Sequence, residues 1–225
     1  VEVIKSSGER AAAIVQDLLT LARRGVNQLQ PVDFNAIVRE YLESPEDRHI
    51  RQLHPKVSYH VDLAPRPLML MASKVHLSKS IMNLVANAAE AMPDGGKLQL
   101  TTRFDPAPMH AGVSEEINAQ GYLYFEVRDT GTGIAPQDRE RIFEPFYTRK
   151  VMGRSGTGLG MAVVWGAVSD HNGQIQVDSE VGEGTSFKIQ LPLSGEALSV
   201  EAPPQEAMPT GNGERLLVVD DELEQ

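Results

Sequence analysis

The chain has 225 residues, of which 41% are hydrophobic, and a formal net charge of −10 at pH 7, which suits one substantial globular domain with appendages. The negative charge argues against nucleic acid as the main partner, and the absence of cysteine excludes disulfides and thiolate metal sites and favours the cytoplasm. No apolar run reaches the roughly 18 residues of a membrane helix. Because the chain starts at Val1 rather than Met, it is expected to be part of a longer protein, and any membrane anchor is expected elsewhere in that protein.

Residues 1–25 have the apolar rhythm of a helix that packs against other helices. Small or apolar residues recur at alternating steps of four and three: Ile4, Gly8, Ala11, Val15, Leu18 and Ala22. One such helix cannot bury this face alone, so a second helix, from upstream chain or from a partner subunit, is expected. An amphipathic helix that lies on its own domain is the alternative.

Residues 26–194 contain segments of both helical and strand periodicity. The patterns first predict a helix at 33–43 capped by Asp33, and then two strands at 56–63 and 67–71 that pair with each other. A helix at 73–92 and strands at 97–104 and 122–129 follow. The last predicted elements are a short helix at 136–143, a helix at 157–171, and strands at 174–179 and 185–191. Residues 195–213 are rich in Pro, Glu, Ser and Gly and indicate a linker.

The helix predicted at 73–92 has two distinct faces. Its apolar residues fall within about a third of the circumference, whereas Asn83, Asn87 and Glu90 lie opposite, within roughly 60° of one another. Amide oxygens suit a magnesium ion that keeps its waters and bridges phosphates, and Glu90 could orient water or neutralise charge. An exposed polar helix face is the alternative.

Asp129 continues the inward phase of the strand at 122–129 and ends its apolar row. A buried carboxylate is costly unless donors reach it. Gly131 and Gly133 leave space beside it for a flat ligand, and Thr185 leads the inward row of another strand in the same way. Two polar groups at the mouth of an apolar slot suit a purine whose amine donates to Asp129. A turn cap by Asp129 on the following amides is the alternative.

Gly156, Gly158 and Gly160 precede an apolar helical pattern. Glycines let backbone amides approach an anion, and a helix start adds unpaired N–H groups and a positive dipole end. Basic residues stand beside them: Arg149, Lys150 and Arg154. This segment predicts a phosphate-holding flap, with a surface loop and glycine hinge as the alternative. It is neither a P-loop nor a dinucleotide fingerprint, because Met161 stands where the last glycine would be.

Four motifs occur in a fixed order: Asn83–Ala88 (NLVANA), Asp129–Ile134 (DTGTGI), Phe143–Phe146 (FEPF) and Gly156–Met161 (GTGLGM). Together they resemble the N, first glycine, F and second glycine boxes of bacterial two-component sensor histidine kinases. The resemblance implies a Bergerat-type α/β two-layer sandwich, with a mixed sheet under about three helices, preceded by a helix of a dimerisation hairpin.

The resemblance also implies ATP and Mg²⁺ as ligands and gives roles to single residues. Asn87 and, more weakly, Asn83 would hold magnesium and phosphates, Asp129 would accept from the adenine amine, and Lys150 would meet phosphates. Asn87, Lys150 and Glu90 are the expected catalytic residues. The other expected nucleotide contacts, in the base pocket and in the lid at 143–160, are Gly131, Gly133, Ile134, Phe146, Gly156, Thr157, Gly158, Leu159, Gly160 and Thr185.

By the same resemblance, residues 1–25 are the second helix of the phosphoacceptor hairpin, 26–194 the catalytic ATP-binding domain, and 214–225 the first strand of a receiver domain. A hybrid sensor kinase is therefore expected. It would form a homodimer through the hairpin, accept phosphate on a histidine upstream of Val1, and pass it to a receiver domain or a response regulator. Another ATPase on the same fold and a nucleotide-binding dimeric scaffold are the rival functions.

Overall fold

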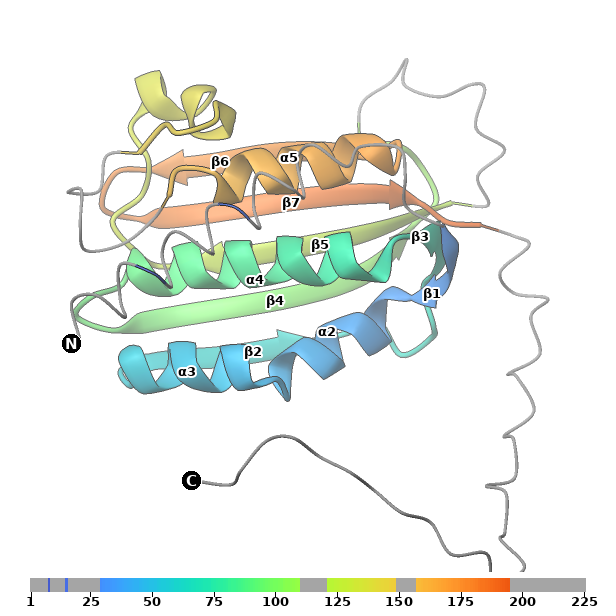
Figure 1. Ribbon diagram of the computed structural model, residues 1–225, viewed down its shortest axis with the longest axis horizontal. Helices are drawn as coiled ribbons and strands as arrows, with labels where there is room; N and C mark the ends of the chain where they lie inside the picture. Colours follow the sequence, from blue (N-terminus) through green and yellow to red (C-terminus); the bar gives the residue numbers. More distant parts are fainter. Residues whose placement is uncertain (1–7, 9–14, 16–28, 110–120, 149–156, 195–225) are drawn as a thin grey trace, which may run out of the picture.

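A computed structural model of the chain describes residues 8, 15, 29–109, 121–148 and 157–194. Four predictions lie outside these residues and stay predictions: the hairpin helix at 1–25, the linker at 195–213, the receiver strand at 214–225, and the roles of Lys150 and Gly156. The described residues form two layers, with the helices on one face of a five-stranded sheet (Figure 1). This arrangement confirms the expected α/β sandwich.

The sheet is mixed, as expected. Its strand order is β2-β4-β5-β7-β6, in which only β2 and β4 are parallel neighbours. The strands span Val57–Asp62 (β2), Gly96–Asp105 (β4), Tyr122–Asp129 (β5), Gln174–Glu180 (β6) and Gly184–Pro192 (β7). A separate antiparallel pair, β1 (Gln30–Asp33) and β3 (Met69–Ala72), lies at one end of the domain (Figure 1).

The helical layer contains more elements than the expected three. The structure has α2 (Phe34–Leu42), α3 (Pro45–Leu53), α4 (Lys74–Glu90) and α5 (Gly160–Asp170), together with two short 3-10 helices, η1 (Pro136–Asp138) and η2 (Arg141–Phe143). The periodicity gave no sign of α3, because this helix is mostly polar. Its start is fixed locally: the Ser44 side chain accepts from the Asp47 N–H at 3.2 Å, and Pro45 occupies the first turn.

The core lies between α4 and the inner face of the sheet. Ile81, Leu84 and Val85 of α4 are at most 1% exposed, and so are Leu123 and Phe125 of β5. Burying each such side chain stabilises the fold by about 1.5–3 kcal/mol. The opposite face of β5 and β7 carries polar residues. Among the described helices, none has both the length and the apolar character of a membrane span.

The pairing predicted for the strands at 56–63 and 67–71 is wrong. β2 pairs with β4, and β3 pairs with β1, which was not predicted as a strand. Side chains at the start of α2 cause the difference: Asn35 donates to the carbonyls of Ala64 and Arg66, and Asp33 accepts from the Leu68 N–H. These bonds hold the chain after β2 against α2 and direct β3 away from β2.

Candidate functional site

A cavity of about 700 Å³ opens between α4, the loop after β5 and the start of α5. Most of the predicted site residues lie on its wall: Asn83, Asn87, Glu90, Asp129, Gly133, Ile134, Thr157, Gly158, Gly160 and Thr185. These residues come from four separate parts of the chain, so the fold brings together three of the four sequence motifs around one space. The cavity is large enough for a nucleotide.

Asp129 lies at the sheet side of this cavity and is 3% exposed. Its Oδ1 accepts from the Gly131 N–H at 2.8 Å, and the Thr185 N–H also donates to the carboxylate. Burial raises the pKa of Asp129 above its ordinary value, and these two hydrogen bonds partly oppose the rise. Asp129 therefore caps the following turn, as the alternative interpretation held, and also presents a carboxylate to the cavity.

The loop after Asp129 is held against the turn between β6 and β7. The Ile134 N–H donates to Ser179 Oγ at 2.7 Å, and the Gly182 N–H donates to the Thr132 carbonyl at 2.9 Å. Gly133 has a φ of +69°, and a side chain there would collide with the Glu180 carbonyl. Only glycine can thus bring the loop so close to β6 while leaving the cavity open.

The polar face of α4 forms the wall opposite the loop. Asn83, Asn87 and Glu90 line the cavity, as their helical phase predicted. Asn83 Nδ2 donates to the Gly160 carbonyl at 3.1 Å. The amide oxygen, which is the atom that could contact a cation, takes no part in this bond.

The second glycine box meets the F box at the cavity mouth. The Phe146 N–H donates to the Gly158 carbonyl at 2.9 Å, and Gly158 has a φ of +71°. The side chain of Phe146 is 62% exposed and Leu159 is fully buried, so the structure places neither on the cavity wall, and Gly131 also lies outside it.

Several lining residues were not predicted. Lys79 lies one helical turn before Asn83, on the same face of α4, and its spacing from Asn83 and Asn87 would have revealed it. Asp138 and Tyr147 are joined by a hydrogen bond of 2.6 Å from the Tyr147 hydroxyl. Asp138 ends η1 and Tyr147 follows η2, and these 3-10 helices of three residues are too short for a periodicity that indicates which side chains face inward.

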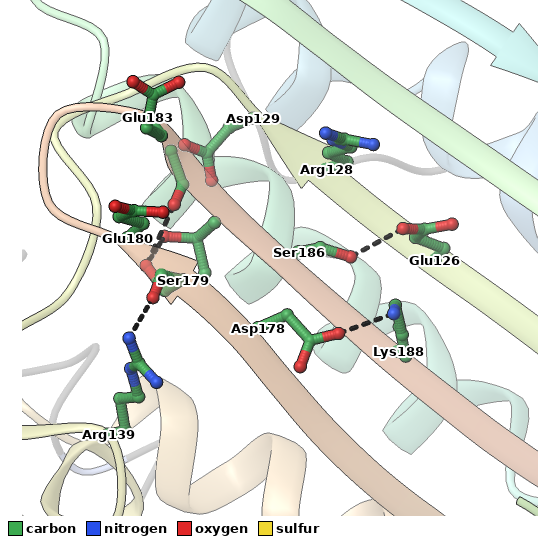
Figure 2. A pocket seen from close by; sticks show the side chains of 12 residues that line it. Glu126, Arg128, Asp129, Arg139, Asp178, Ser179, Glu180, Glu183, Ser186 and Lys188 are labelled. Atoms are coloured by element: carbon green, nitrogen blue, oxygen red, sulfur yellow. Dashed lines mark hydrogen bonds and ion pairs between the residues drawn. The ribbon is translucent and has the colours of Figure 1, made fainter. Parts of the chain in front are cut away.

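A second hollow of about 610 Å³ lies on the outer, polar face of the sheet, and shares Asp129 and Thr185 with the first cavity. Figure 2 shows that its polar and charged side chains bind one another: Lys188 Nζ lies 2.5 Å from Asp178 Oδ2 in an ion pair, and the Ser186 hydroxyl donates a hydrogen bond to Glu126 at 2.6 Å. This hollow has no apolar slot for a base, so the cavity beside α4 is the candidate nucleotide site.

Comparisons with known proteins agree with this geometry. The family profile of histidine kinase-, DNA gyrase B- and HSP90-like ATPases matches residues 72–195. Sensor kinase CckA of Brucella abortus (strain 2308) is 37% identical over 190 residues, covering 84% of this chain and 20% of CckA. Sensor histidine kinase ZraS of Escherichia coli (strain K12) is 30% identical over 194 residues, covering 86% of this chain and 37% of ZraS.

Among solved structures, full-length ShkA in complex with AMPPNP matches with a TM-score of 0.62 and 26% identity, covering 86% of this chain and 38% of ShkA. The chain therefore spans well under half the length of these relatives. The comparisons confirm the resemblance to sensor histidine kinases, while the hybrid type stays a prediction. The chain belongs to the histidine kinase-, DNA gyrase B- and HSP90-like ATPase family, and its relatives within that family are bacterial sensor histidine kinases.

Proposed function

We propose that this chain is the catalytic core of a sensor histidine kinase, which binds ATP beside α4 and transfers its γ-phosphoryl group to a histidine outside the described residues. The observation that carries the proposal is the buried carboxylate of Asp129 on the wall of a cavity whose other side is the polar face of α4. The relatives named as sensor kinases favour this reaction over that of other ATPases on the same fold.

The chemistry of the wall divides the cavity into two parts. Asp129 accepts from the adenine amine, and Ile134 and Met161 offer apolar contacts to the base. Asn83, Asn87, Lys79 and the Gly158–Gly160 backbone offer polar groups to the phosphates. The similarity to the structure of ShkA in complex with AMPPNP supports the binding of an adenine nucleotide in this cavity.

The donor set also fits magnesium. In the described ranges, no group of three or more histidine or carboxylate side chains could hold a metal ion, so the cation would rely on Asn87, on the Asn83 oxygen and on the nucleotide phosphates. Bound there, magnesium would neutralise phosphate charge. The protein's part is to position the triphosphate and exclude water, with Glu90 near the metal side of the cavity. Lys150 is proposed to assist at the phosphates from outside the described residues.

We further propose that the intact protein is a dimer that passes its phosphate to a receiver domain or response regulator, which its similarity to sensor kinases supports. The first test of the site is a calorimetric titration of the chain with ATP in the presence and absence of magnesium. Saturable binding that magnesium strengthens is expected. A folded chain that binds no ATP under either condition would overturn the proposal.

A further inference from the structure

Helices α4 and α5 both reach the cavity, and two side-chain hydrogen bonds join them. At the cavity, Asn83 Nδ2 donates to the Gly160 carbonyl at 3.1 Å. At the other end, the Ser73 N–H donates to His171 Nε2 at 2.9 Å. The two bonds lie about 15 Å apart along each helix, at a rise of about 1.5 Å per residue. They pair the start of α4 with the end of α5, so the helices are antiparallel and connected at both ends.

His171 makes the distal bond as a neutral ring. It is 5% exposed, and its Nδ1 lies 2.6 Å from the Ala167 carbonyl. A carbonyl only accepts and a backbone N–H only donates, so the geometry requires the ring proton on Nδ1 and a lone pair on Nε2.

The charged and titratable groups around this joint come from both helices. His76 of α4 is 7% exposed, and burial and the nearby His171 both lower its pKa, while Asp170 of α5 raises it. Lys74, next to Ser73, is paired with Glu40 of α2 at 2.7 Å. The joint therefore contains two buried imidazoles, and the pKa of His76 is lowered partly by its neighbour His171.

We propose that His171 is a positioning residue for nucleotide binding: through Ser73 it fixes the distal ends of α4 and α5, and so sets the distance between Asn83 and Gly160 at the cavity. This inference rests on the proposed function, because it assigns the phosphate side of the same site. α5 is a continuous helix of 11 residues and is largely buried, so a displacement of one end is passed to the other. Loss of the bond between Ser73 and His171 would therefore shift the first turn of α5 against α4.

The test compares His171→Phe, which fills the space but cannot accept from Ser73, with His171→Gln, whose side-chain oxygen can accept. Affinities for ATP and for adenosine are measured by calorimetry on the 225-residue chain at pH 7.5. His171→Phe is expected to lower the ratio of ATP to adenosine affinity about five- to tenfold, and His171→Gln to restore it. An unchanged ratio in folded His171→Phe would overturn the proposal, since a merely structural role lowers stability without changing that ratio.

A second variant keeps the proposal testable if His171→Phe does not fold. Ser73→Pro removes the backbone N–H that donates to His171, and the φ of Ser73, −84°, suits proline. The ratio of ATP to adenosine affinity is expected to fall as in His171→Phe. An unchanged ratio in the folded Ser73→Pro protein would contradict the proposal.

Hydrogen exchange separates this inference from the proposed function, because it needs no nucleotide. The Val163 N–H donates to the Leu159 carbonyl at 2.9 Å in the first turn of α5. Faster exchange of this amide is expected in His171→Phe, and wild-type exchange in His171→Gln. If the chain binds no ATP but shows this exchange pattern, the proposed function is refuted while the positioning role of His171 between the two helices stands. Equal exchange in all three proteins refutes the positioning role alone.

Discussion

Asp129 and Thr185 occupy paired positions on neighbouring strands β5 and β7, and both side chains are buried where an apolar row ends. The Thr185 N–H donates to the Asp129 carboxylate, and the Thr185 hydroxyl lies 2.9 Å from Ser179 Oγ. The sheet thus holds one acidic and one hydroxyl side chain in fixed positions at the base of the cavity. We propose that this pair is the part of the site that recognises a base.

Asp129→Asn is expected to weaken ATP binding by about 1–3 kcal/mol. An amide can still accept from the Gly131 N–H, but its NH₂ group then faces the adenine amine, and two donors cannot bond. Calorimetric titration with magnesium-ATP measures the loss. Asp178→Asn, which alters a paired carboxylate on the outer face of the sheet, is the matched control and should bind normally. Equal affinity in both variants would remove Asp129 from the site.

The same variant is expected to change the pH dependence of stability. Burial raises the pKa of Asp129 in the folded chain. The stability that its protonated form contributes is therefore fully present below its unfolded value of about 3.8, and is lost as the pH rises through the folded value. Asparagine does not titrate, so Asp129→Asn should gain unfolding free energy relative to wild type between about pH 4 and pH 7. Urea denaturation without nucleotide measures this difference, and a constant difference would contradict the account.

Asn87→Ala is expected to reduce the affinity for magnesium-ATP far more than the affinity for adenosine, because the role proposed for Asn87 is at the phosphates and the cation rather than at the base. The comparison is made by calorimetry with both ligands. Val75→Ala is the control, since Val75 lies on the same helix and is 74% exposed. Equal losses for ATP and adenosine would indicate damage to the fold instead of loss of a metal ligand.

Two glycines of the lid are expected to differ in their tolerance of alanine. Gly158 has a φ of +71°, and an added Cβ would lie 2.6 Å from the Phe146 carbonyl carbon. At Gly160 the nearest contact would be Asn83 at 3.3 Å, with no such φ. Gly158→Ala should therefore lower thermal stability and ATP affinity more than Gly160→Ala. The reverse order in melting and calorimetric measurements would contradict the described geometry.

Periodicity alone predicted where several polar side chains of the candidate site lie. Helical phase placed Asn83 and Asn87 together, and strand alternation placed Asp129 inward, because both patterns follow directly from backbone geometry. The pairing of β3 with β1 could not be predicted in this way, since it depends on long-range bonds from Asn35 and Asp33. The contact between Asp138 and Tyr147 joins the short helix η1 to the chain after η2 and depends equally on tertiary structure.

The roles of Phe146 and Leu159 show a further limit of reasoning from motifs. Both stand within sequence boxes that resemble nucleotide-binding boxes, yet one side chain is exposed and the other is buried away from the cavity. In both cases the backbone around the residue, rather than its side chain, shapes the site: the Phe146 N–H bonds to Gly158, and the Leu159 carbonyl starts the hydrogen bonding of α5.

The most direct test of the central claim is phosphoryl transfer from γ-labelled ATP. The chain alone should acquire no stable label, because transfer requires a histidine in line with the γ-phosphate. His171, for example, is buried at the end of α5, about 16 Å from Gly160 at 1.5 Å per residue. Joined to a helical hairpin that carries an acceptor histidine, the chain should acquire an acid-labile, alkali-stable phosphate, and Asn87→Ala should abolish that labelling. Stable label on the chain alone, or none on a joined protein that binds ATP, would contradict the kinase function.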